Sequence, residues 1–186
     1  MTSPLTRHRI HIFGASGSGT TTLGKAIAAA TGLQHLDTDD FYWEPTNPPF
    51  TQKREPGERL ALLLAEFERA SAGWVLSGSL CGWGDSLIPR FQLAVFLTLD
   101  PRVRLQRLRA RAAHRYGAER LATGGDLAEA HATFLAWAQQ YDTGGLEIRS
   151  RTLHEQWMES LPIPILRLDS QRSVPELYAA VIGAAY

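Results

Sequence analysis

Short apolar runs alternate along the chain with longer stretches in which apolar residues recur at helical spacing. The runs are bounded by glycine, proline or acidic residues and predict strands at 9–13, 33–37, 74–77, 93–97 and 163–168. The stretches between them place apolar residues every three or four positions, which predicts helices. These helices are expected at 20–31, 58–70, 101–114, 126–141, 147–161 and 173–185.

Strands that alternate with helices in this way predict a parallel sheet covered by helices on both faces, that is, a three-layer α/β/α domain. Both faces of 93–97 are apolar, so this strand is expected in the interior of the sheet. The segment 41–50 is rich in aromatic residues and proline, and we expect a loop without regular structure there. The capping box from Ser173 to Glu176 opens the last helix. Because no repeat or linker divides the chain, residues 1–186 are expected to form a single domain.

The composition restricts the classes of partner. The 19 basic and 19 acidic residues cancel, which disfavours sequence-independent binding to nucleic acid. The single cysteine, Cys81, allows no internal disulfide and fits a reducing compartment. No stretch approaches the roughly 20 apolar residues that a membrane helix needs. We therefore expect a cytoplasmic protein that does not enter a membrane.

A glycine-rich segment joins the first strand to the first helix. It consists of Gly14, Ala15, Ser16, Gly17, Ser18, Gly19, Thr20, Thr21 and Thr22. Glycines in this context allow a tight turn whose backbone N–H groups, together with the helix N-terminus, face phosphate oxygens. The spacing matches G-x-x-x-x-G-K-[ST], except that Thr20 stands at the lysine position, while Thr21 stands at the position of the Mg²⁺-binding hydroxyl.

Two other interpretations of this loop remain. The small residues of the loop could merely form a tight turn from strand to helix, without binding a ligand. Alternatively, the loop could belong to a dinucleotide-binding fold with Asp37 as the ribose-binding acid. The order G-x-x-G-x-G differs from the dinucleotide pattern, so we favour the phosphate loop.

On these residues the chain resembles the P-loop kinases of small metabolites, the group that contains adenylate, shikimate and gluconate kinases. More narrowly, it is similar to uncharacterised bacterial proteins described as adenylate kinase-like. The resemblance implies the P-loop NTPase fold with strand order 2-3-1-4-5, ATP as phosphate donor and Mg²⁺ as cofactor. It also implies a substrate-binding segment at 41–59, an arginine-rich lid at 102–125, and a loop at 169–173 near the nucleotide base.

Acidic residues follow the second strand as Asp37-Thr38-Asp39-Asp40. The resemblance assigns Asp37, with Thr21, to the metal and Asp39 to the substrate or to the role of base; carboxylates beside a triphosphate suit both tasks. The alternative is a solvated acidic turn that caps the next segment. After the third strand the chain has Ser77-Gly78-Ser79 where adenylate kinases carry an acid, which makes AMP a poor candidate for the acceptor.

Arginines are concentrated between Arg102 and Arg120, where Glu119 is the only acid. Their spacing puts four on one helical stripe: Arg104, Arg107, Arg111 and Arg115. Guanidinium groups suit phosphate oxygens, so we expect a catalytic role for Arg107, Arg111 and Arg115. The alternatives are a solvated basic face and an RNA-binding patch, the latter disfavoured by the neutral total charge. Arg149 and Arg151 are assigned to the surface by default, the alternative being that they reach the phosphates from the helix after the lid.

Two functions remain open. The first is a kinase that transfers the γ-phosphate of ATP to a small hydroxyl or phosphate acceptor, held by the aromatic residues and cations of 41–59. The second is a nucleotide-binding sensor or partner module without phosphotransfer, suggested by the absence of the loop lysine. Lys53 or a lid arginine could replace that lysine.

Overall fold

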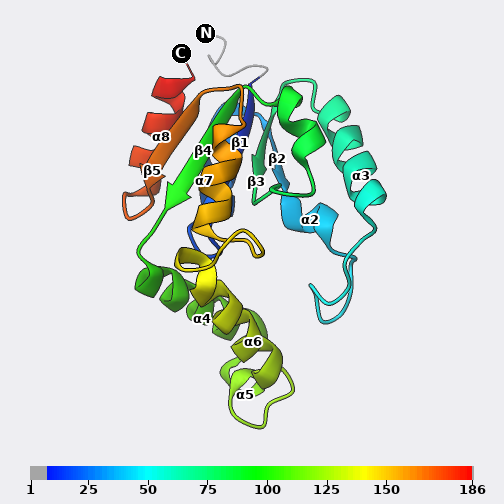
Figure 1. Ribbon diagram of the computed structural model, residues 1–186, viewed down its shortest axis with the longest axis vertical. Helices are drawn as coiled ribbons and strands as arrows, with labels where there is room; N and C mark the ends of the chain where they lie inside the picture. The colour runs from blue at the N-terminus through cyan, green and yellow to red at the C-terminus, as the bar shows by residue number, and fades with distance from the viewer. Residues whose placement is uncertain (1–7, 186) are drawn as a thin grey trace.

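The computed structural model describes residues 8–185, so the ends of the expected domain lie outside the described residues. Five parallel strands form its sheet in the order β2-β3-β1-β4-β5, which confirms the expected order (Figure 1). The strands are β1 (Arg9–Gly14), β2 (Gln34–Asp37), β3 (Trp74–Ser77), β4 (Leu93–Thr98) and β5 (Ile165–Asp169).

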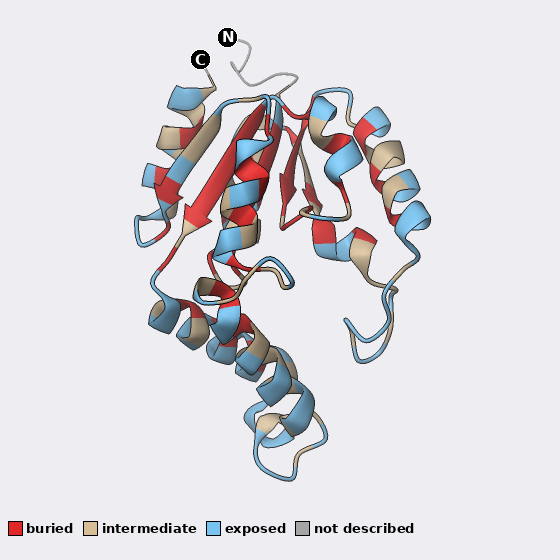
Figure 2. Cartoon of the chain, viewed as in Figure 1, coloured by how far each residue is buried: buried red, intermediate tan, exposed pale blue. Residues whose placement is uncertain are grey.

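Helices cover both faces of the sheet. Helices α1 (Thr20–Thr31) and α8 (Val174–Ala184) pack on one face, and α3 (Pro56–Arg69) and α7 (Arg151–Glu159) on the other. Successive side chains of a strand point to opposite faces. On β1, Ile12 therefore joins the core under α1 and α8, while Phe13 joins the core under α3 and α7. Figure 2 shows β1 and β4 buried between helices whose outer faces are exposed.

A short helix, α2 (Thr38–Tyr42), follows β2 directly. The expectation of a segment without regular structure is therefore wrong at Phe41 and Tyr42. The Asp37 carboxylate accepts a hydrogen bond of 3.1 Å from the Asp39 backbone N–H and so caps this helix. Beyond α2 the segment has the irregular structure expected, held by an antiparallel bridge between Trp43 and Lys53.

Helices α4 (Pro101–Tyr116), α5 (Ala118–Leu121) and α6 (Ala128–Gln139) extend beyond the carboxyl ends of the strands (Figure 1). Besides α2, two short elements were not expected: α5 and the 3₁₀ turn η1 (Asp85–Arg90). A second 3₁₀ turn, η2 (Gln140–Asp142), stands where the helix expected at 126–141 was to end. The capping box of α8 is confirmed. No helix between residues 8 and 185 has both the length and the apolar character needed to cross a membrane.

The helix expected at 147–161 begins only at Arg151. Ser150 is its N-cap, because the Ser150 hydroxyl accepts a hydrogen bond of 3.0 Å from the Leu153 N–H. Arg149 consequently lies in the loop before α7, at the carboxyl edge of the sheet, rather than inside a surface helix.

Candidate functional site

The glycine-rich loop leaves the central strand β1 and enters α1. Gly17 and Gly19 have φ angles of 84° and 93°, which favour glycine. A Cβ atom on Gly17 would lie 2.9 Å from the Arg104 carbonyl oxygen and 3.1 Å from Leu108 Cγ. The loop therefore rests directly against α4, and a larger residue does not fit at Gly17.

The start of α1 fits a phosphate group. Gly19 is the N-cap, and no side chain of the described residues caps the helix, so N–H groups of its first turn are available to an anion. The hydroxyl of Ser18 is buried and has no hydrogen-bond partner within residues 8–185. The loop thus leaves hydrogen-bonding groups available to an anion, and phosphate binding by residues Gly14 to Thr22 stays a prediction.

Thr21 and Asp37 meet across the site. The Thr21 hydroxyl donates a hydrogen bond of 2.8 Å to Asp37 Oδ2, which links the first turn of α1 to the end of β2. Oxygen ligands of this kind fit Mg²⁺, which in phosphate sites takes one or two protein oxygens and completes its coordination with water and phosphate. Within residues 8–185 no three His, Cys, Asp or Glu side chains form a metal site of their own.

Asp39 lies in the first turn of α2, beside Asp37. Removal from water and the Asp37 charge raise the pKa of Asp39, while the positive charges of Arg149 and Arg111 lower it in part. A carboxylate whose pKa moves towards neutral is better suited to take a proton at physiological pH. Asp39 thus combines a perturbed pKa with two neighbouring cations.

The expected arginine stripe of α4 reaches three parts of the site. Arg107 Nη1 lies 3.7 Å from the position of a Cβ on Gly19, and its Nη2 donates to the Ser170 carbonyl at 3.4 Å. The charge of Arg111 acts on Asp39. The Arg115 guanidinium lies 5.4 Å from the ring centroid of Phe50 in the 41–59 segment. The helix thus presents a cation to the phosphate loop, to the carboxylates and to the expected substrate segment.

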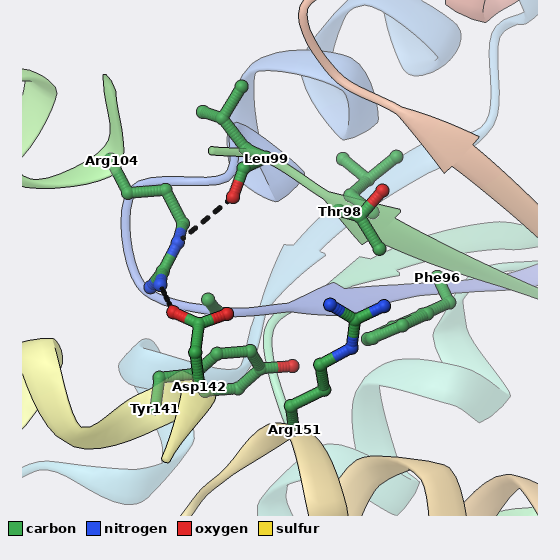
Figure 3. Close-up of a pocket in the computed structure, with 9 residues that line it drawn as sticks. Phe96, Thr98, Leu99, Arg104, Tyr141, Asp142 and Arg151 are labelled. Carbon is green, nitrogen blue, oxygen red and sulfur yellow. Dashed lines mark hydrogen bonds and ion pairs between the residues drawn. The ribbon is translucent and has the colours of Figure 1, made fainter. Parts of the chain in front are cut away.

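Arg104 does not belong to this stripe, so that expectation is wrong. Its side chain is 2% exposed, forms an ion pair with Asp142 and donates from Nε to the Leu99 carbonyl at 3.3 Å (Figure 3). It shares the buried side of α4 with Leu108 and Ala112, at i+4 and i+8. Arg104 therefore ties the first turns of α4 to Asp142 of η2 and to Leu99.

Arg149 is also placed differently from the expectation. It is half-buried, and its Nη2 donates a hydrogen bond of 2.6 Å to the hydroxyl of Ser16 in the phosphate loop. Its guanidinium stacks 4.7 Å from the ring centroid of Trp137. Arg151, by contrast, is exposed as expected. The capping serine at position 150 was the sequence signal that could have placed Arg149 in a loop.

The 41–59 segment contains both aromatic residues and cations. Arg59 is buried, with its guanidinium 3.9 Å from the ring centroid of Tyr42 and 6.0 Å from that of Trp83. Arg54 donates to the Phe41 carbonyl at 3.1 Å and pairs with acidic side chains of the same segment. Arg54 therefore holds the shape of the segment, whereas Arg59 lies among the aromatic rings that could border a small ligand.

A buried polar chain, which the sequence did not suggest, lies behind the site. His154 shares a hydrogen bond of 2.9 Å with the Ser79 hydroxyl and one of 2.8 Å with the Tyr141 hydroxyl. Burial, assisted by the charges of Arg149 and His11, lowers the pKa of His154 to about 3. Burial likewise lowers the pKa of His11 to about 4, although its hydrogen bond with the Gly78 carbonyl opposes the shift. Both imidazoles are therefore neutral in the folded protein.

Comparison with known proteins gives matches along most of the chain. A family model described as "AAA domain" matches residues 10–130. Uncharacterized protein YqaC of Bacillus subtilis is 48% identical over 170 residues, which span 91% of this chain and 93% of YqaC. Cytidylate kinase of Archaeoglobus fulgidus is 29% identical over 113 residues, which span 55% of this chain and 61% of that kinase.

Solved structures share the fold at low sequence identity. Shikimate kinase from Acinetobacter baumannii, in complex with shikimate, aligns with a TM-score of 0.53 and 18% identity over 97% of this chain and 93% of its own. A gluconokinase from Sinorhizobium meliloti 1021 aligns with a TM-score of 0.51 and 21% identity over 97% of this chain and 92% of its own. These likenesses confirm the P-loop kinase fold.

Proposed function

This chain belongs to the AAA domain family of P-loop proteins, and we propose that it is an ATP-dependent kinase of a small molecule. The observation that carries the proposal is that the loop is bonded to Asp37 through Thr21 and to Arg149 through Ser16, while the charges of Arg149 and Arg111 act on Asp39. A loop that only connected a strand to a helix would not need two carboxylates and two cations beside it. We propose the cytoplasm as its location, which the single cysteine fits.

The phosphates of ATP bind to the N–H groups of Gly14 to Thr22, and the base lies near residues 169–173. Thr21 and Asp37 would hold Mg²⁺, and the ion would neutralise phosphate charge. Arg107 lies between these two regions, since it contacts Ser170 and lies beside Gly19. Its guanidinium is therefore suited to a phosphate close to the nucleoside.

The acceptor binds between the 41–59 segment and α4. Its oxygen forms a bond to the γ-phosphorus while the bond from that phosphorus to the β–γ bridging oxygen breaks, and ADP leaves. When the acceptor is a hydroxyl, its proton passes to Asp39. Arg111 and Arg115 offset the negative charge of the transferred group and of an anionic acceptor.

The second candidate is a nucleotide-binding module that transfers no phosphate. The observation that favours it is the absence of any charged side chain from Gly14 to Thr22, because Thr20 offers only a neutral hydroxyl. Charge-assisted hydrogen bonds are roughly twice as strong as neutral ones, so the loop alone stabilises transferred charge weakly.

Phosphate transfer from labelled ATP, measured with Mg²⁺ over a panel of acceptors, separates the two candidates. Gluconate, shikimate and cytidine monophosphate come first in the panel, since the names of the similar proteins point to them. Label transferred to an acceptor supports the kinase. Measurable ATP binding with no transfer to any hydroxy acid or nucleotide would favour the module, and absence of ATP binding would exclude both.

Asp39→Asn tests the base for a hydroxyl acceptor. We expect turnover to fall by about 10²- to 10⁴-fold, the usual contribution of a positioned base, while the affinity for ATP changes little. Asp40→Asn is the matched control, because Asp40 is the next acid along the chain and has no role in the proposed reaction. Equal losses in both variants would show that the general negative charge matters and not the position of Asp39.

A further inference from the structure

The phosphate loop lacks a cation of its own although acidic residues surround it. Asp37 ends β2, Asp39 and Asp40 lie just after it, and a bound triphosphate would add further negative charge. The chain has two lysines. Lys25 is exposed on α1, and its charge acts on His35 and Asp40. Lys53 is exposed and lies 5.9 Å from the Tyr42 ring centroid, in the 41–59 segment.

Arg149 contacts the loop itself and is held there on several sides. Its Nη2 donates to Ser16 Oγ at 2.6 Å, and Trp137 lies against the guanidinium at 4.7 Å. The next residue, Ser150, is buried; its hydroxyl donates to the Gly145 carbonyl at 2.6 Å and caps α7. The backbone that carries Arg149 is thus fixed, and its side chain lies on the phosphate loop without a conformational change.

The guanidinium of Arg149 retains hydrogen-bonding capacity. Its Nε atom is buried and has no partner within residues 8–185. Burial lowers the pKa of Arg149, and the Asp39 charge raises it. Arginine titrates so far above neutral pH that the group remains a cation. A half-buried cation with a buried, unpaired donor is costly unless a ligand completes its hydrogen bonds.

The position of Arg149 also indicates which phosphate it serves. Its hydrogen bond is to the loop, whereas its charge interacts with Asp39 first, then with Tyr141 behind the site and with Tyr42 in the 41–59 segment; Asp39 and Tyr42 lie on the acceptor side. The group that lies between the loop and the acceptor is the terminal phosphate. Arg107 lies at the other end of the loop, beside Gly19 and Ser170. Arg107 is therefore placed for a phosphate close to the nucleoside, and Arg149 for the terminal phosphate.

We infer that Arg149 supplies, from the loop before α7, the positive charge on the terminal phosphate that a lysine at position 20 would supply from within the phosphate loop. This inference rests on the proposed function. In the transfer, Arg149 exchanges no proton: the γ-phosphorus leaves the bridging oxygen for the acceptor oxygen, and Arg149 stays bonded to the transferred group's oxygens. The missing lysine is in this way compensated by a residue that is distant in sequence.

Calorimetric titration with ATP and with ADP, both in the presence of Mg²⁺, tests the inference without requiring an acceptor. Arg149→Ala should weaken ATP binding by about 10- to 100-fold, the range for a hydrogen bond to a charged group, and ADP binding by much less. Arg149→Lys keeps the charge and should retain part of the preference for ATP. Arg151→Ala removes an exposed arginine two residues away and should change neither affinity.

The double variant Thr20→Lys with Arg149→Ala provides the decisive arm. If Arg149 supplies the positive charge that the missing lysine would supply, the new lysine at position 20 should restore the preference for ATP over ADP. Unchanged ATP affinity in Arg149→Ala, or an equal loss of ATP and ADP that Thr20→Lys does not reverse, would overturn the inference and leave the proposed kinase intact. A wild-type protein that binds no ATP would overturn both.

Discussion

Acidification should destabilise this protein because His11 and His154 are buried as neutral imidazoles. Their folded-state pKa values of about 4 and about 3 lie below the ordinary value of 6.5, so the unfolded chain binds more protons in this range. The stabilising contribution is complete above pH 6.5 and is lost as the pH falls towards 4. Between pH 7 and pH 5 each histidine should reduce the free energy of unfolding by about 2 kcal/mol, or about 4 kcal/mol together.

Urea unfolding followed by tryptophan fluorescence at pH 7 and at pH 5 measures this loss. His154→Gln should reduce the difference between the two pH values by about 2 kcal/mol, whatever its stability at pH 7, because the titrating group is gone. The control is His114→Gln, since His114 is exposed on α4. The raised pKa of Asp39 acts in the opposite direction and makes the total slightly smaller. The same pH dependence in His154→Gln as in the wild type would refute the reasoning.

Two further substitutions test how the site is built. Gly17→Ala should lower the free energy of unfolding by about 2 kcal/mol and weaken ATP binding, since the new Cβ meets the Arg104 carbonyl at a positive φ. Thermal unfolding and calorimetric titration with ATP measure the two effects. Gly57→Ala is the control, because the space around Gly57 is open and the change should be neutral or stabilising. Arg104→Met should lower the free energy of unfolding in urea by about 2–3 kcal/mol, because it leaves Asp142 unpaired. The control Arg109→Ala removes an exposed arginine and should lower it by less than about 0.5 kcal/mol. Equal effects of the two substitutions would show that the ion pair contributes nothing.

The elements predicted well are those whose signals are local. The β4 run is apolar at every buried position, and the phosphate loop is contiguous, so neither depends on distant parts of the chain. The start of α7 was misplaced because no glycine or proline stands between Glu147 and Arg151 to mark a boundary. The Ser150 cap sets the boundary instead, and periodicity alone does not register a cap.

The side chains predicted less well are those whose role depends on a distant partner. Arg104 matches the spacing of the exposed stripe, but its acceptors are the Leu99 carbonyl and Asp142, the latter 38 residues away. Arg149 donates a hydrogen bond to Ser16, which is 133 residues away in the sequence. No local pattern reveals which arginine is buried, because only the assembled fold brings the acceptors into place.

The contact between Gly17 and α4 has a mechanical consequence. The loop presses on the helix at Arg104 and Leu108, so displacement of α4 as a rigid rod would distort the phosphate cradle. The outer turn of α4 lies beyond this contact, and the helix ends at Tyr116, just before Gly117 with its φ of 83°. A bend in that outer turn would move Arg115 relative to the 41–59 segment while Arg107 stayed beside the loop. Such a bend would separate adjustment to an acceptor from retention of the nucleotide.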